Sequence, residues 1–300
     1  MIIPSYLQSG DTVAIAAPAR KISQEELAPA VAMLEKAGFN IYYDNRLFAQ
    51  HHQFAGDETV RTAYFQDLLD NPEVNAIWCA RGGYGSARII DRLDFSRFCK
   101  QPKWICGYSD VTVFHNHIHQ NFEIATLHAT MPISVQPDTW NTPAVSSFVA
   151  ALKGETLRYT LPPHPLNRVA TVTAPVVGGN LSMLYSLLGS PSDLNTDGKI
   201  LFIEDLDEYL YHIDRMMTNL ERNGKLSKLA GLIVGHLSDM HDNTIPYGKN
   251  AEEIVAEHCE GYNFPVFFNF PAGHLPDNRA IRLGLPMSIE IENNVVITEN

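Results

Sequence analysis

Short apolar segments alternate with helical segments through the first half of this 300-residue chain. Residues 12–16, 74–80 and 104–106 are apolar runs, and each leads into a turn that contains proline, glycine or serine. Between the first two runs, residues 57–69 begin with the capping residue Asp57 and carry apolar side chains at helical spacing. Strands that alternate with helices form a mostly parallel sheet covered by helices. We therefore predict an α/β fold.

The second half of the chain has a more mixed pattern. Residues 199–203 and 232–234 indicate strands, and the tail around Asn293-Asn294 favours a hairpin. The strand and helix signals weaken before residue 165, where three prolines occur within four positions. We expect a first domain in residues 1–150, a linker in residues 151–170 and a second domain in residues 171–300.

The composition excludes several classes of partner. A formal net charge of −12 is a poor match for nucleic acid or for an anionic membrane surface, which attract basic proteins. The chain has no apolar run long enough to span a bilayer, and its first residues do not resemble a secretory signal. The four cysteines form no C-x-x-C pair and fit a reducing compartment. We expect a cytoplasmic protein that binds neither nucleic acid nor membranes.

Ser109 follows a predicted strand in the segment Gly107-Tyr108-Ser109-Asp110 and precedes a predicted helix. A sharp turn from a strand into a helix exposes a serine hydroxyl and directs free N–H groups toward it. The match to G-x-S-x-G is partial, because Val111 stands where the second glycine is usual. Ser109 is therefore a candidate nucleophile, and an ordinary helix N-cap is the alternative.

A glycine-rich turn, residues 81–85, follows another predicted strand. The carboxyl ends of parallel strands meet at one edge of a sheet, where ligands bind. Backbone N–H groups in this turn could stabilise an oxyanion or hold a phosphate, and a plain tight turn is equally compatible with the spacing. The turn does not meet the G-x-G-x-x-G spacing of a dinucleotide site.

A nucleophilic serine needs a histidine base that is oriented by a carboxylate. His274 lies in a turn rich in glycine and proline, and Glu204 ends an apolar strand. A structural turn histidine and an acidic helix start are the respective alternatives. His115 with His119, and His236 with His241, are weaker candidates for a metal site, because neither pair has a third ligand at a characteristic spacing.

Five segments together resemble the muramoyltetrapeptide LD-carboxypeptidases, a serine peptidase family that also contains microcin-immunity proteins. They occur in the family's order over nearly the whole chain: residues 80–85, 107–110, 178–181, 201–205 and 273–274. The resemblance implies a Rossmann-like N-terminal domain, which carries the nucleophile, and a smaller β-rich α/β C-terminal domain, which carries the acid and the base.

The resemblance also implies the chemistry of the site. Ser109, Glu204 and His274 would form a catalytic triad, and the N–H groups of Gly83 and Asp110 would form the oxyanion hole. The implied reaction is release of terminal D-alanine from muropeptide tetrapeptides during cell-wall recycling, with no metal or organic cofactor and with a homodimer as the assembly. Arg81 is a candidate for binding the terminal carboxylate, or else it forms a structural ion pair.

Two further functions stay open from the sequence. The first is a microcin-immunity peptidase that cleaves an amide beside a nucleotide-like group, although only 95 positions separate Ser109 from Glu204 and leave little room for an extra loop. The second is a non-catalytic protein that binds phosphate or sugar at residues 81–85. No role is predicted for residues 178–180.

Overall fold

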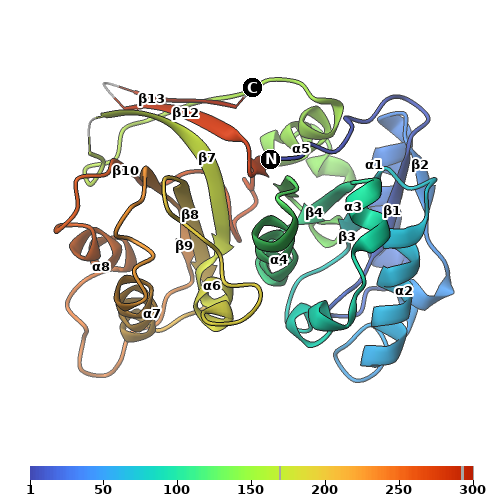
Figure 1. The fold of residues 1–300 in the computed structure, drawn as a ribbon, viewed down its shortest axis with the longest axis horizontal. Coiled ribbons are helices and arrows are strands. Elements are labelled where there is room, and N and C mark those ends of the chain that lie inside the picture. Colours follow the sequence, from blue (N-terminus) through green and yellow to red (C-terminus); the bar gives the residue numbers. More distant parts are fainter. Residues whose placement is uncertain (169, 292–293, 300) are drawn as a thin grey trace.

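The computed structural model describes residues 1–168, 170–291 and 294–299, and Figure 1 shows two sheets side by side with helices against them. Strand order in the first sheet is β11-β5-β4-β3-β1-β2, and all neighbours are parallel except β11 and β5. The strands are β1 (Thr12–Ala16), β2 (Asn40–Tyr42), β3 (Ala76–Cys79), β4 (Trp104–Gly107), β5 (Thr126–His128) and β11 (Ile281–Leu283).

Two helices of the first half begin directly after residues whose side chains cap them. Ser23 accepts a hydrogen bond from the Glu26 N–H, and Asp57 accepts one from the Val60 N–H. Residues Ser86–Arg88 and Ile90–Arg92 form two short 3-10 turns after the glycine-rich turn. The helices are α1 (Gln24–Lys36), α2 (Glu58–Asp70), α3 (Ser96–Lys100), α4 (Thr112–Phe122) and α5 (Pro143–Lys153).

The second sheet has the order β10-β9-β8-β7-β12-β13-β6, with β7 to β10 parallel and the remaining pairs antiparallel. Its strands are β6 (Leu157–Leu161), β7 (Ala170–Asn180), β8 (Ile200–Leu206), β9 (Gly231–Ser238), β10 (Val266–Phe267), β12 (Pro286–Ile291) and β13 (Val295–Glu299). The associated helices are α6 (Leu181–Leu187), α7 (Leu210–Arg222) and α8 (Ala251–His258). The predicted α/β fold class is confirmed.

Strand pairing divides the chain differently from the expected boundaries. The predicted linker contains β6, which forms the edge of the second sheet, and its prolines follow that strand rather than interrupt it. Strand β11 belongs to the second half of the sequence but pairs with β5, placing Ile281 opposite His128. Such pairings join segments far apart in the chain, so local patterns do not reveal them. The strands of the predicted tail hairpin are β12 and β13, while Asn293 lies outside the described residues.

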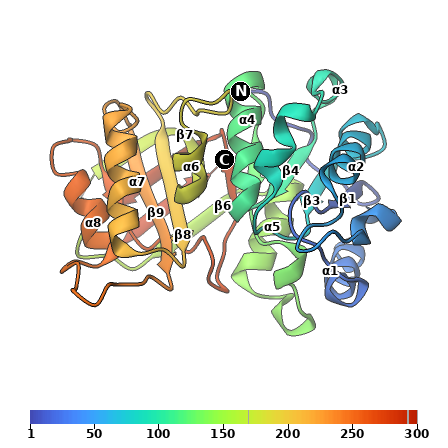
Figure 2. The same cartoon turned by 90° about the horizontal axis from the view of Figure 1, so that it is seen from below.

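Residues 178–180 bring the two halves into contact. A Cβ added to Gly179 would lie 2.5 Å from Thr112 Oγ1, so only glycine lets β7 approach α4 this closely. The Asn180 N–H donates to Thr112 Oγ1 at 3.0 Å, and Figure 2 shows α4 beside α6. One apolar core runs from the first sheet into the second, so the two halves form one packed body.

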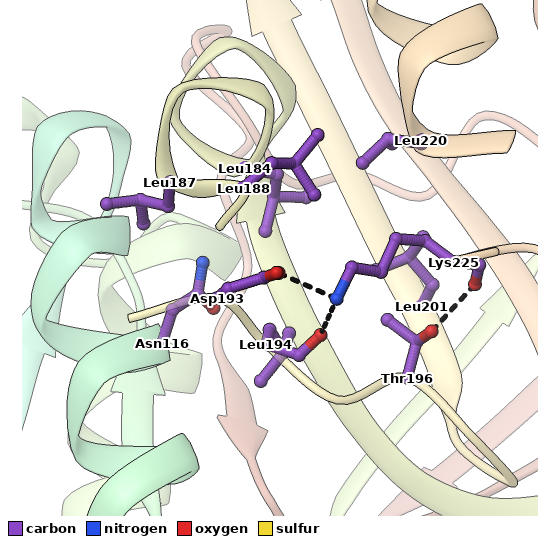
Figure 3. Close-up of a pocket in the computed structure, with 10 residues that line it drawn as sticks. All are labelled: Asn116, Leu184, Leu187, Leu188, Asp193, Leu194, Thr196, Leu201, Leu220 and Lys225. Atoms are coloured by element: carbon purple, nitrogen blue, oxygen red, sulfur yellow. Dashed lines mark hydrogen bonds and ion pairs between the residues drawn. The ribbon is translucent and has the colours of Figure 1, made fainter. Parts of the chain in front are cut away.

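A small apolar cavity lies between α4 and α6, with Asn116 opposite the leucines of α6 (Figure 3). On its far side Lys225 Nζ forms an ion pair with Asp193 Oδ1 at 2.6 Å. The cavity volume of about 10 Å³ holds one water molecule at most, so this region is packing between the halves rather than a substrate site. The described helices include none long and apolar enough to cross a membrane.

Candidate active site

Three neighbouring strands of the first sheet end at the same edge. β1, β3 and β4 are adjacent and parallel, so the segments that follow them, which carry Arg20, Gly83 and Ser109, emerge together. The edge is closed from the other half of the molecule by β7, β8 and the turn that carries His274. The candidate site therefore lies between the two halves.

Ser109 is the first residue of a 3-10 turn between β4 and α4, and its backbone is left-handed, with φ of 62°. An N-cap residue has an extended backbone and accepts a hydrogen bond, whereas the extended residue here is Tyr108, which makes no side-chain cap. Ser109 is thus not an ordinary helix cap. A non-glycine residue held in the left-handed region is strained, and such strain gathers at functional sites.

The glycine-rich turn packs directly against Ser109. A Cβ added to Gly82 would lie 3.0 Å from Ser109 Oγ, so this position has no room for a side chain. Gly83 has φ of 103°, and its N–H has no acceptor among the residues that the structure describes. Gly83, Ser109 and Asp110 line one cavity of about 250 Å³, so the turn and the elbow share one site.

Glu204 and His274 form a buried pair on the opposite side. Glu204 is fully buried in β8, and its Oε2 lies 2.7 Å from His274 Nδ1. Gly273 makes this approach possible, because a Cβ there would lie 3.0 Å from the same oxygen. Burial by itself lowers the pKa of His274, but the charge of Glu204 and its hydrogen bond outweigh burial, so the pKa is raised. With Nδ1 held by Glu204, Nε2 is left to accept a proton.

The serine and the histidine approach each other without bonding directly. The ring of Tyr108, the neighbour of Ser109, lies 4.9 Å from the ring of His274. No hydrogen bond joins Ser109 and His274 among the described side chains, and they line separate cavities. A catalytic hydrogen bond is often loose before substrate binds, so this geometry is compatible with a triad that closes on substrate.

Arg81 and Asp110 have partners inside the first half. Arg81 lies 3.4 Å from Glu26, which is the ion-pair alternative raised by the sequence. Asp110 is buried, and its Oδ2 accepts a hydrogen bond from the Ser86 N–H at 2.8 Å. Burial raises the pKa of Asp110. The Asp110 side chain therefore supports the glycine-rich turn, while its backbone lies beside Ser109.

Three buried histidines of the first half, His115, His119 and His128, have lowered pKa values, in contrast to His274. His115 Nε2 lies 2.9 Å from the Gly107 carbonyl, and burial lowers the pKa of His115 to about 4. Burial likewise lowers the pKa of His119 and of His128 to about 3 each. Nowhere in the described ranges do three or more His, Cys, Asp or Glu side chains form a group that could hold a metal ion.

Three polar residues that line the cavity, Asn180, Ser182 and Asp205, were given no role by the sequence. Asn180 Nδ2 donates to Asp205 Oδ1 at 3.0 Å, and the Ser182 N–H donates to Asp205 Oδ2 at 2.8 Å. Burial, followed by the charge of Glu204, raises the pKa of Asp205 to about 7. The Gly-Gly-Asn sequence before α6 was the only sequence signal for these residues. It could not be interpreted from the sequence, because the role of the two glycines depends on the contact between β7 and α4.

A strained serine at a strand-to-helix turn, free N–H groups beside it and a buried glutamate–histidine pair opposite are features of a serine hydrolase. Comparison with known proteins agrees. Residues 13–129 match the LD-carboxypeptidase N-terminal domain, and residues 173–289 match the LD-carboxypeptidase C-terminal domain.

Relatives match almost the entire chain. A probable murein peptide carboxypeptidase of Bacillus subtilis is 34% identical, covering 99% of this chain and 94% of that protein. The microcin C7 self-immunity protein MccF of Escherichia coli is 27% identical, covering 99% of this chain and 96% of its own. The crystal structure of muramoyltetrapeptide carboxypeptidase from Oxalobacter formigenes superposes with a TM-score of 0.86 at 25% identity, covering 96% of this chain and 98% of that one. The chain belongs to the LD-carboxypeptidase family and is a serine-type peptidase, which confirms the family predicted from the sequence.

Proposed function

We propose that this enzyme releases the terminal D-alanine from tetrapeptide stems of murein, by cleaving the bond between an L-centred diamino acid and D-alanine. The observation that carries the proposal is the buried Glu204–His274 pair, facing the strained Ser109 across the junction of the two halves. The names of the Bacillus and Oxalobacter relatives supply the substrate class.

His274 takes the proton from the Ser109 hydroxyl as the oxygen attacks the scissile carbonyl. Glu204 holds the imidazole through Nδ1 and stabilises its charged form, in agreement with the raised pKa of His274. His274 then donates the proton to the leaving amine of D-alanine, and water hydrolyses the acyl-enzyme in a second cycle. The residues in these roles require no metal or organic cofactor.

In this mechanism the N–H groups of Gly83 and Asp110 donate hydrogen bonds to the oxyanion of the tetrahedral intermediate. Both residues line the cavity that contains Ser109, and the Gly83 N–H lacks an acceptor within the described part of the chain. Donors that are already oriented stabilise the developing charge without reorganisation, and losing one typically costs about 3 kcal/mol of barrier.

A microcin-type substrate is the second candidate, because MccF is a relative over nearly the whole chain. The alignment with MccF extends over 338 positions, against 303 for the Bacillus relative. MccF therefore contains extra segments that this chain lacks, and we favour the murein substrate. We further propose that the enzyme works as a homodimer in the cytoplasm, which light scattering and cell fractionation would test.

The experiment compares D-alanine release from a disaccharide-tetrapeptide with hydrolysis of an aminoacyl-sulfamoyl-adenylate. We expect turnover of the tetrapeptide to dominate and to disappear in Ser109→Ala. Equal release of D-alanine by Ser109→Ala would contradict the assigned nucleophile. Preferential turnover of the adenylate would replace the murein substrate by the microcin-type one.

A further inference from the structure

Five arginines surround the glycine-rich turn beside Ser109, and they differ in their partners. The side chains of Arg61, Arg81, Arg88 and Arg92 are held by backbone carbonyls, by Glu26 or by Glu58. Arg20 is exposed, and its guanidinium has no hydrogen bond or ion pair with any residue that the structure describes. Of these five arginines, Arg20 is therefore the one whose guanidinium needs no rearrangement to bind an anion.

Arg20 also packs on Gly83, one of the two proposed oxyanion donors. It follows β1, whose neighbours β3 and β4 carry the glycine-rich turn and Ser109. A Cβ added to Gly83 would overlap with Cγ and Cδ of Arg20, so the methylene groups of the arginine cover this glycine. Gly83 and Ser109 line the same cavity, and the stem of Arg20 packs on Gly83 just outside that lining.

The opposite wall of this cavity carries the opposite charge. It is lined by Asp205, Asp207 and Glu208, and no lysine or arginine is among the residues that line the cavity. A carboxylate of the substrate would be repelled from that wall and attracted to the side of Arg20. The charges around Ser109 thus orient a substrate that has a free carboxylate at one end.

From these contacts, and on the basis of the function proposed above, we infer that Arg20 binds the free carboxylate of the terminal residue. The guanidinium presents paired N–H donors that match a carboxylate, and such hydrogen bonds are stronger than neutral ones. Arg20 would make the enzyme an exopeptidase, because a peptide that continued past this residue would lack the carboxylate. Arg81, already paired with Glu26, would not take this role.

The test uses a stem tetrapeptide that ends in D-alanine and the same peptide ending in D-alaninamide. Arg20→Gln is the informative variant, because glutamine keeps carbon atoms at the Cβ, Cγ and Cδ positions that pack on Gly83 and removes the charged guanidinium. We expect wild type to prefer the acid by about 10- to 100-fold in kcat/KM. In Arg20→Gln, kcat/KM for the acid substrate should fall by that factor, while kcat/KM for the amide should stay unchanged. Arg81→Gln is the matched control and should keep the wild-type preference.

The outcomes separate this inference from the proposed function. If wild type releases D-alanine and Arg20→Gln keeps the preference for the acid, the role of Arg20 is overturned while the proposed function stands. An equal loss on both peptides would assign Arg20 to support of the Gly83 turn, and would also overturn its role in binding carboxylate. If wild type cleaves neither peptide, the proposed function fails, and the inference about Arg20 fails with it.

Discussion

The two sides of the candidate site are built in different ways. Ser109 and Gly83 are positioned by backbone conformation, with φ angles of 62° and 103° at turns that directly follow strands. Glu204 and His274 are positioned by burial and by a hydrogen bond between residues 70 positions apart in the chain. One side depends on local geometry, and the other depends on the packing of the second half.

This difference has a consequence for reactivity. The strained elbow exposes the hydroxyl but contains no base, because His115 of α4 is bound to the Gly107 carbonyl and its pKa is lowered to about 4. On the other side, Glu204 raises the pKa of His274, but the pair has no nucleophile of its own. Because the candidate nucleophile and the candidate base lie in different halves, we expect activity to be lost when the contact between the halves is disturbed.

The largest expected effect comes from removing one residue on each side. Ser109→Ala and His274→Ala should each lower kcat by about 10⁴- to 10⁶-fold, and the double variant should lose no more than either single one. The measurement is D-alanine release, with circular dichroism to confirm folding. Losses that multiply in the double variant would show that the two sides act independently.

The next effect tests the electrostatic role of Glu204. In Glu204→Gln, kcat should fall by about 10³- to 10⁴-fold, because the imidazole loses its orienting charge. His274 must be neutral to act as a base, so kcat/KM in wild type rises as pH increases through its raised pKa. Without the carboxylate, burial of His274 is opposed by the charge of Asp205 and no longer by Glu204, so the pKa of His274 falls and the acid limb should move to lower pH. If the acid limb of the kcat/KM profile in Glu204→Gln stayed at the wild-type pH, the titrating group would not be His274.

The smallest of these effects concerns the contact between β7 and α4. In Gly179→Ala, the new Cβ would lie 2.5 Å from Thr112 Oγ1, with φ at 141°. We expect the free energy of unfolding to fall by about 1–3 kcal/mol and kcat to fall by up to about 10²-fold, as the halves shift. Thermal unfolding and D-alanine release measure the two changes.

Gly189→Ala is the matched control for this substitution. Gly189 also has a positive φ, of 76°, but a Cβ there would meet no atom within 4 Å. It should lose about 1 kcal/mol of stability from backbone strain and keep its activity. If both variants lost activity equally, the close approach of β7 to α4 would not be what aligns the two sides.

Local signals predicted much of the first half. Asp57 begins a helix as expected, and the strands before Ser109 and before the glycine-rich turn lie where their apolar runs indicated. The same signals left Ser109 open between a nucleophile and a helix cap. Only its backbone angle distinguishes the two, and that angle reflects packing of the whole elbow.

The sequence by itself determined the α/β class and the family, and it supplied the candidates for the catalytic residues, because strand periodicity, capping residues and short motifs act over a few positions. The tertiary structure decided what joins distant segments: β11 in the first sheet, β6 in the second, and the contact of Gly179 with Thr112. It also decided that Arg81 is paired with Glu26, while the guanidinium of Arg20 has no partner among the described residues. Contacts between residues far apart in the chain depend on the packing of the whole fold, which no local pattern records.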